Sequence, residues 1–289
     1  SSHHRAQLYN PEDKTRESLL EGLSMDMDGA IERGELELHY QPKVTLDTCQ
    51  TRSLEALVRW RHPQRGLIPP GLFIAEAEAT GAIHKITLWA IKEALRFANA
   101  LEDDLVRIAV NISAFDLATP TFEDEVRELF GGNEALAQRL IFEVTESVAM
   151  ADAQNSACML GRFRDMGILI SMDDFGTGQS SLGMLEALPI DEVKIDRSLI
   201  VGSENNSRKC MVLKSVIELG RRLGLTVTAE GVETNYLVNW LQAAGCHVVQ
   251  GYYFSKPLSA PAMEWMLLDR ALRPTTPVAE VLPGGAAMP

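Results

Sequence analysis

The sequence predicts an α/β protein, a TIM-like (β/α)8 barrel with one antiparallel strand pair at its start. Eight short extended segments alternate with helical segments over most of the 289 residues. The first two are joined only by the polar stretch VTLDTCQT, which suits an antiparallel hairpin because parallel strands need a longer crossover. Polar residues sit at or near the strand ends, where such barrels place their active sites. A doubly wound open sheet is the alternative, but the chain lacks its G-x-G-x-x-G turn.

The extended segments are short apolar runs, and the helical ones carry apolar residues at a helical period. We expect strands at 35–43, 52–60, 106–113, 140–146, 168–174, 191–196, 225–230 and 246–251. Helices are predicted over 85–101, 122–130, 208–224 and 234–245. The last helix should end on Gly245, a residue suited to a helix C-terminus. Its Leu237, Leu241 and Ala244 should share one face.

Both ends of the chain differ in composition from the barrel segment, which we expect to span 35–272. Residues 1–34 open on SSHH, typical of an expression-tag remnant, and continue with apolar residues at helical spacing. We interpret them as a tag remnant followed by an N-terminal linker helix. Residues 273–289 are rich in Pro, Gly and Ala, which predicts a flexible tail.

The charge and composition exclude several classes of protein. A formal net charge of −13 argues against binding a nucleic-acid polymer, so an anionic substrate would need local positive charge. No apolar run is long enough to span a membrane, and no secretory signal opens the chain. The four cysteines are scattered, which fits a reduced cytoplasmic protein and gives no zinc motif. We therefore expect the domain to face the cytoplasm.

Polar residues at the strand ends form the candidate site. A single one would more often be a buried group satisfied by backbone or water. Five converging carboxylates are different, because without cations at least one would have to stay protonated. Oxygen ligands favour Mg²⁺ or Mn²⁺ over zinc. The residues are Glu55, Asn111, Glu143, Asp173, Asp174, Lys194, Glu230 and Gln250.

The stretch ISMDDFGTG places two adjacent aspartates at the end of an apolar strand. We interpret Asp173 as a bridge between two cations, with Asp174 serving one of them. Paired cations about 3.5–4 Å apart are a common solution for hydrolysing phosphate esters. Lys194 is the one cation expected among these acids. It could orient or deprotonate the attacking water, hold a phosphate oxygen, or pair with Asp173 or Asp174, and the sequence leaves these roles open.

Eight motifs occur in order from about residue 35 to 258: LHYQPKV, EALVRWRHP, AVNIS, FEVTES, DDFGTGQSSL, VKIDRSLI, AEGVET and QGYYFSKPL. Together they resemble the EAL-domain phosphodiesterases, named after the triplet that here is Glu55-Ala56-Leu57. The resemblance implies hydrolysis of the bacterial second messenger cyclic di-GMP to linear pGpG. It also implies that this chain is the output domain of a longer signalling protein. That protein would have a regulatory domain upstream of residue 1 and would form a homodimer. Some relatives bind without cleaving, so a silent receptor or protein-interaction domain is the alternative. An enzyme acting on another phosphoester is a third possibility.

The resemblance also assigns roles by position. It implies one ion of a Mg²⁺ or Mn²⁺ pair at Glu55, Asn111, Glu143 and Asp173, and the second at Asp173, Asp174 and Glu230. Catalytic roles fall to Lys194, Glu55 and Glu230. Substrate contacts fall to Gln41, Leu57, Arg59 and Gln250.

Two further glutamates receive roles outside the metal set. The resemblance implies that Glu146 anchors a mobile loop, DFGTGQSS, and the alternative is a solvent-facing or helix-capping acid. We expect Glu233 to be structural, at a helix N-terminus where negative charge is favoured. The chain departs from the family pattern at TCQT and FIAEAEATGAI, and no proposed ligand is lost there.

Overall fold

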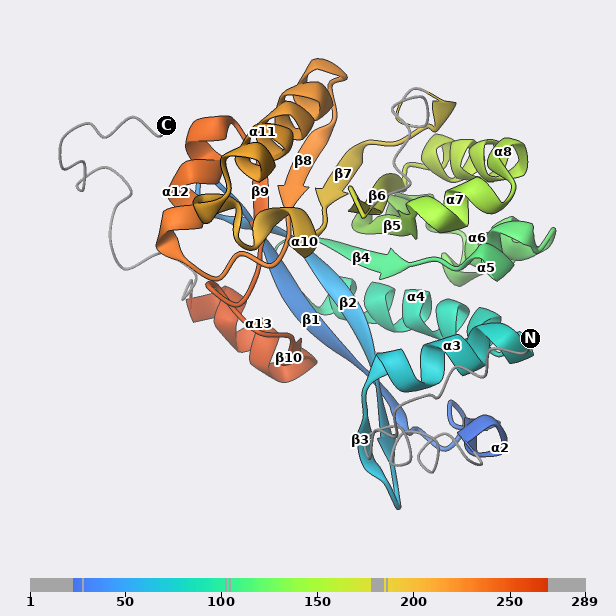
Figure 1. Ribbon diagram of the computed structural model, residues 1–289. Helices are drawn as coiled ribbons and strands as arrows, with labels where there is room; N and C mark the ends of the chain where they lie inside the picture. Colours follow the sequence, from blue (N-terminus) through green and yellow to red (C-terminus); the bar gives the residue numbers. More distant parts are fainter. Residues whose placement is uncertain are drawn as a thin grey trace, which may run out of the picture.

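The computed structural model describes residues 23–269 except 28, 102, 104, 178–184 and 186. A closed barrel of eight strands lies at its centre, and helices surround the barrel (Figure 1). The barrel strands are β1 (Leu36–Thr45), β2 (Thr51–His62), β4 (Arg107–Asn111), β5 (Leu140–Thr145), β6 (Leu169–Phe175), β7 (Glu192–Ile195), β8 (Thr226–Ala229) and β9 (Val248–Gln250). Two short strands, β3 (Gly66–Ile68) and β10 (Leu258–Ser259), extend the sheet antiparallel to β2 and β1.

The predicted fold class is confirmed, including the antiparallel pair β1 and β2. The strands β2 and β4 to β9 run parallel to one another. β1 is also antiparallel to β9, a second reversed pairing that the sequence did not indicate. It follows from closure, since a single reversed strand is antiparallel to both of its neighbours. The eight predicted strand segments match the eight barrel strands with small shifts at their ends.

The helices pack around the barrel and follow the predicted segments where predictions were made (Figure 1). On the outside of the strands lie α4 (Ile83–Ala100), α6 (Phe122–Leu129), α8 (Ala153–Asp165), α11 (Ser207–Arg222) and α12 (Asn235–Ala244). Shorter or peripheral helices are α2 (Leu23–Met27), α3 (Pro70–Thr80), α5 (Ala114–Ala118), η1 (Glu134–Arg139), α7 (Glu146–Ala151), α10 (Arg197–Ile200), η2 (Ser203–Asn205) and α13 (Ala260–Asp269).

Helix α12 illustrates how local chemistry sets the ends of an element. The Thr234 side chain accepts a hydrogen bond from the Leu237 N–H at its start. Gly245 ends it with φ of 86°, a left-handed conformation that glycine adopts without steric cost. Leu237 and Leu241 are buried and Ala244 packs against them, as their shared face predicts.

Two apolar clusters hold the fold together. The main cluster fills the space between the strands and the surrounding helices. A second, smaller one joins α2 to β2, α3 and the start of α4 through Leu23, Trp60 and Phe73. The part of the predicted linker helix that is described is α2. The remainder of that prediction, residues 1–22, and the predicted tail at 273–289 lie outside the described residues.

His84 connects three helices outside the barrel. Its Nδ1 lies 2.7 Å from an oxygen of the buried Asp116 on α5, and its Nε2 lies 2.8 Å from an oxygen of Glu125 on α6. Burial disfavours the charged imidazole, but the hydrogen bonds to both carboxylates outweigh it and raise the His84 pKa. Asp116 also accepts from Ser113, the cap of α5, so the network lies just beyond the end of β4.

We predict that His84→Gln lowers the free energy of unfolding by about 1–3 kcal/mol at pH 6, where the charged imidazole makes both hydrogen bonds. Because the His84 pKa is higher in the folded than in the unfolded state, its protonation stabilises the fold. This stabilisation is complete at a pH below the unfolded-state pKa and is lost as the pH rises through the folded-state pKa. The difference between the wild type and the variant should therefore shrink by pH 9. Urea denaturation at the two pH values measures it. A difference that is the same at both values would contradict a charged His84.

Candidate functional site

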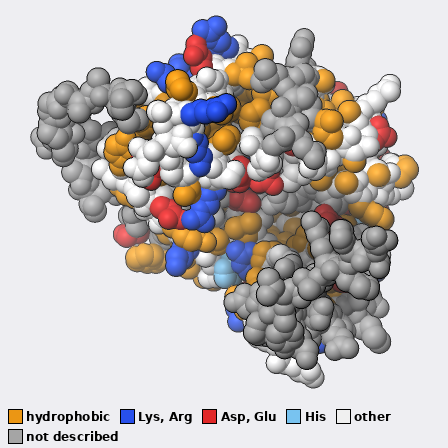
Figure 2. All heavy atoms as spheres, viewed as in Figure 1, with side chains coloured by type: hydrophobic (Ala, Val, Ile, Leu, Met, Phe, Trp, Pro, Cys, Tyr) orange, Lys and Arg blue, Asp and Glu red, His pale blue; other side chains and the backbone are white. Residues whose placement is uncertain are grey.

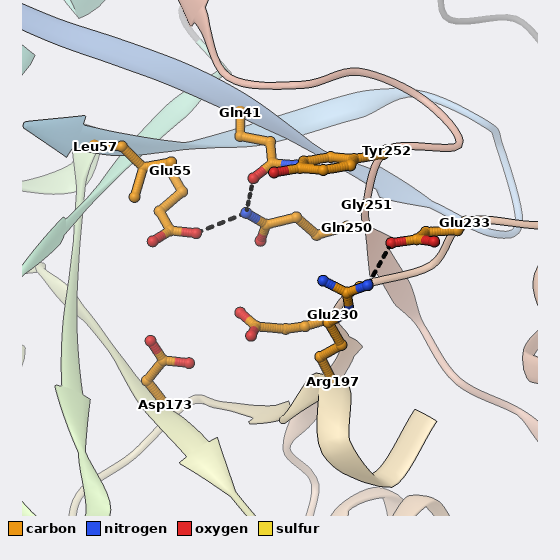
Figure 3. Close-up of a pocket in the computed structure, with 11 residues that line it drawn as sticks. Gln41, Glu55, Leu57, Asp173, Arg197, Glu230, Glu233, Gln250, Gly251 and Tyr252 are labelled. Carbon is orange, nitrogen blue, oxygen red and sulfur yellow. Dashed lines mark hydrogen bonds and ion pairs between the residues drawn. The ribbon is translucent and has the colours of Figure 1, made fainter. Parts of the chain in front are cut away.

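A cavity of about 230 Å³ opens at the carboxyl ends of the parallel strands, and Figure 3 shows the side chains around it. Six of the predicted site residues line it, which confirms that the topology brings them together. The carboxylates of Glu55, Asp173 and Glu230 point into it from β2, β6 and the end of β8. The full lining is Gln41, Glu55, Leu57, Asp173, Arg197, Glu230, Gly231, Glu233, Gln250, Gly251 and Tyr252.

Figure 2 shows acidic atoms grouped near the centre of the face that is also drawn in Figure 1. Glu55 and Asp173 are nevertheless largely buried, at 8% and 9% exposed. They therefore sit in a hollow where water screens charge only partly, so their mutual repulsion is stronger than on an open surface.

Lys194 is the centre of the charge arrangement. Its fully buried ammonium lies 2.7 Å from Glu230, 3.0 Å from Glu143, 3.1 Å from Asp173 and 3.6 Å from Glu55. Burial alone would lower the Lys194 pKa, but the four carboxylates outweigh it and hold that pKa well above its ordinary value. Lys194 is thus a salt-bridge partner of Asp173, one of its predicted roles. This raised pKa favours the protonated ammonium, a hydrogen-bond donor.

The acids respond differently to the same environment. Burial, with repulsion from Asp173 and Glu55, raises the Glu230 pKa to about 8 against the attraction of Lys194. Burial also raises the Glu55 pKa. Glu143 is more deeply buried, yet two ammoniums outweigh its burial and keep its pKa below the ordinary value. The site therefore has an excess of acids over cations, as the sequence predicted.

The prediction that Lys194 is the one cation among the acids is wrong. Lys43 on β1 is also fully buried and bonds to Glu143, with Glu192 at 3.4 Å on its other side. Lys43 was assigned no role from the sequence, although it is the last residue of the predicted strand at 35–43. A signal was available: Gln41 and Lys43 are two positions apart, so they face the same side of a strand.

The three acids assigned to the second ion lie close together. Asp173, Asp174 and Glu230 each offer an oxygen, and these atoms lie within 4.8 Å of one another. Asp174 has φ of 57°, an uncommon conformation for a residue other than glycine. Burial and the neighbouring Asp173 raise the Asp174 pKa. These oxygens match the donors that Mg²⁺ and Mn²⁺ prefer.

The residues assigned to the first ion also meet. Asn111 Nδ2 donates to Glu55 Oε1 at 3.3 Å, and Asn111 and Glu143 are register partners on β4 and β5. Glu143 and Asp173 share the Lys194 ammonium. The donor set is again oxygen-rich, so it suits the same class of cation.

Gln250 and Gln41 form one wall of the cavity. Gln250 Nε2 donates to Glu55 Oε2 at 2.6 Å and to Gln41 Oε1 at 3.2 Å (Figure 3). Gln41 in turn donates to the Ser255 carbonyl. Among the described residues Gln250 Oε1 has no hydrogen-bond donor although it is buried. This carbonyl oxygen can therefore accept a hydrogen bond from a bound molecule.

Arg59 and Glu146 neither line the cavity nor belong to the predicted cation ligands. Arg59 is half-buried on β2, and its guanidinium donates to the neighbouring Val58 carbonyl at 2.9 Å. Glu146 is 4% exposed in the first turn of α7, which excludes a solvent-facing acid. Most of the loop that Glu146 was predicted to anchor lies outside the described residues.

Arg197, Glu233 and Tyr252 line the cavity, and the sequence reasoning gave none of them a place there. Arg197 donates to Glu233 at 2.7 Å across the rim (Figure 3). Glu233 directly precedes Thr234, the cap of α12, so its expected position near a helix N-terminus is confirmed. Its position in the cavity wall was missed. The signal was proximity in sequence, since these residues lie two or three positions from Lys194, Glu230 and Gln250.

Solved structures confirm the fold. The structure titled "PaMucR Phosphodiesterase, c-di-GMP complex" has a TM-score of 0.78 and 41% identity, and the match covers 83% of this chain and 99% of that one. The EAL enzyme Bd1971, in a form bound to cAMP and cyclic di-GMP, has a TM-score of 0.81 and 31% identity over 89% of this chain and 71% of that one.

Curated relatives are longer than this chain. Cyclic di-GMP phosphodiesterase NbdA of Pseudomonas aeruginosa is 40% identical over 241 residues, which are 82% of this chain and 31% of NbdA. The bifunctional diguanylate cyclase/cyclic di-GMP phosphodiesterase MucR of the same species is 42% identical over 238 residues, 81% of this chain and 35% of MucR. The chain therefore spans about a third of the length of these relatives. The family model described as "EAL domain" matches residues 25–257, and the chain belongs to the EAL domain family.

Proposed function

We propose that this chain hydrolyses cyclic di-GMP to linear pGpG with the help of two divalent cations, Mg²⁺ or Mn²⁺. The observation that carries the proposal is the group of buried carboxylates around one cavity at the carboxyl end of the barrel, with fewer ammoniums than acids. Two family members with 40% and 42% identity bear the name cyclic di-GMP phosphodiesterase, which supports the substrate.

The cation ligands follow from the donor sets. Glu55, Asn111, Glu143 and Asp173 would hold one ion, and Asp173, Asp174 and Glu230 the other. When bound, two such ions stabilise the charge that develops on phosphate oxygens and make a water molecule more acidic. Burial of these acids favours binding, because each cation removes repulsion that water screens only partly.

The chain's own side chains would position the reactants. Lys194 would donate a hydrogen bond from Nζ to the attacking water or to a phosphate oxygen, since the surrounding carboxylates keep it protonated. Water oxygen forms the new bond to phosphorus as the bond to the ribose 3′-oxygen breaks, and the proton that the water loses is balanced by the one the 3′-oxygen gains, leaving a 5′-phosphate and a free 3′-hydroxyl. Glu55 and Glu230, which line the cavity, would act as cation ligands beside the reacting phosphate.

Substrate contacts would come from the cavity wall. Gln250 would accept a hydrogen bond from the nucleotide at its unpaired Oε1. Gln41 would hold the Gln250 side chain in place. Leu57 offers apolar surface at the rim. Arg59 would have to leave the Val58 carbonyl to reach a phosphate, a task that suits its planar guanidinium.

The wider context is also part of the proposal. The relatives' greater length supports a longer signalling protein with an upstream regulatory domain. In this proposal residues 1–34 are a tag remnant and a linker helix, 35–272 the catalytic barrel and 273–289 a flexible tail. We propose a homodimer that faces the cytoplasm. Among the described residues, every helix is too short or too polar to span a bilayer.

The direct test is product analysis by ion-exchange chromatography of the purified chain incubated with cyclic di-GMP. Stoichiometric pGpG should form with Mg²⁺ or Mn²⁺ and stop when EDTA removes the metal. Tight binding without product under both metals would instead indicate a receptor. If a cyclic mononucleotide inhibited the hydrolysis of cyclic di-GMP as strongly as unlabelled cyclic di-GMP does, another phosphoester would be the substrate.

We predict that Glu55→Ala lowers kcat more than about a hundredfold, equivalent to about 2.7 kcal/mol of transition-state stabilisation. Circular dichroism and thermal unfolding should stay near those of the wild type, because removing one of several buried acids also removes repulsion. Glu37→Gln, at a partly exposed acid near the start of β1 that pairs with Arg61 and does not line the cavity, is the matched control and should keep wild-type turnover. Activity that survives in folded Glu55→Ala would contradict the assignment.

Lys194→Met should lower kcat much more than it raises KM for cyclic di-GMP. The reason is that Lys194 would contact the reacting water or phosphate and not the guanine bases of the substrate. Steady-state kinetics at saturating Mn²⁺ separates the two parameters. The variant loses the counter-ion of four carboxylates, so its folded fraction must be measured with Mn²⁺ present. A rise in KM at constant kcat would assign Lys194 to substrate binding alone.

A further inference from the structure

Lys43 lies beneath the site and has no part in the proposed chemistry. It is on β1, its side chain is fully buried, and it does not line the cavity. Gln41, two residues earlier on the same strand, does line it. Because β1 runs opposite to its neighbours, the later residue is the deeper one: Gln41 pairs with Glu55, and Lys43 with Ser53. Lys43 is therefore one layer below the cavity floor.

The Lys43 ammonium connects that lower layer to one predicted metal ligand. It bonds to Glu143 Oε1, and it lies 3.4 Å from Glu192 Oε2. Glu192 Oε1 in turn accepts a hydrogen bond from the Thr228 hydroxyl on β8. All of these side chains are buried, so the chain of contacts is shielded from water.

Glu143 is consequently held at both of its oxygens by different cations. Oε1 bonds to Lys43 below, and Oε2 lies 3.0 Å from Lys194. The Lys194 ammonium also touches Glu55, Asp173 and Glu230, so Oε2 is the oxygen on the cavity side. Among the described residues the Lys43 ammonium is the group that holds Oε1, so without it the carboxylate could rotate.

We propose that Lys43 is a positioning residue that ties Glu143 Oε1 to the layer below the site and so keeps Oε2 directed at the first cation. The inference rests on the proposed function, because it assigns Glu143 to a divalent ion. Groups that orient a metal ligand in this way commonly change metal affinity by about 10–100-fold when they are removed. Lys43 touches neither substrate nor cation.

The test must separate positioning from charge balance. Lys43→Met alone leaves Glu192 without its cation and changes the net charge of the site, so it would also destabilise the fold. The double variant Lys43→Met/Glu192→Gln has the net charge of the wild type and lacks the tie to Glu143. Thr228→Val is the control for a disturbed lower layer, because it removes the hydroxyl bonded to Glu192 without touching Lys43 or Glu143.

Isothermal titration of the full chain with MnCl2 measures the result. Wild type and Thr228→Val should bind two ions with the same affinities to within about twofold. The double variant should bind one ion about 10–100-fold more weakly and the other normally. Its turnover of cyclic di-GMP should fall at low Mn²⁺ and recover at high Mn²⁺, with an unchanged KM for the nucleotide, which a purely structural role would not produce.

Two results would overturn the proposal in distinguishable ways. If the folded double variant binds both ions as tightly as the wild type, Lys43 only balances charge, and the proposed function is unaffected. If the wild type itself binds no Mn²⁺, the metal assignment fails, and the role of Lys43 fails with it. Circular dichroism of each variant before titration establishes that the measured protein is folded.

Discussion

The need to neutralise buried carboxylates governs the whole site. Glu55, Glu143 and Asp173 lie in a hollow where repulsion is only partly screened, and Glu230 adds a further acid. Lys194 neutralises part of this negative charge because its ammonium contacts four carboxylates at once. The acids still outnumber the ammoniums, so added positive charge would be favoured at the carboxyl end of the barrel. The proposed pair of divalent cations would supply it.

The reversed strand β1 adds a second level to this arrangement. In the parallel strands, side chains nearer the carboxyl end face the cavity and earlier ones lie deeper, as Lys194 and Glu192 do on β7. On β1 the order is inverted, so Gln41 reaches the cavity and Lys43 lies below it. The reversed direction of β1 therefore places Gln41 in the cavity wall and Lys43 below it, as a buried counter-ion for Glu143.

Much of the fold and the convergence of the acidic strand ends could be predicted from the sequence, because both depend on periodic signals. Alternation of apolar segments fixed the eight strands, and barrel topology then required the polar strand ends to meet. Lys43 and Glu192 were missed because their partners come from distant strands. The wall residues Arg197, at the start of the short helix α10, and Tyr252, in a loop, were missed because the direction of such side chains depends on packing and follows no period.

The central claim is that these acids hold two cations against a nucleotide phosphate. Anomalous diffraction at the manganese edge, from crystals of the chain grown with MnCl2 and a non-hydrolysable analogue of cyclic di-GMP, tests it most directly. The account predicts two peaks, one beside Glu55, Asn111 and Glu143, the other beside Asp174 and Glu230, with Asp173 between them. A cavity with analogue bound and no anomalous peak, or peaks only at other acids, would contradict it.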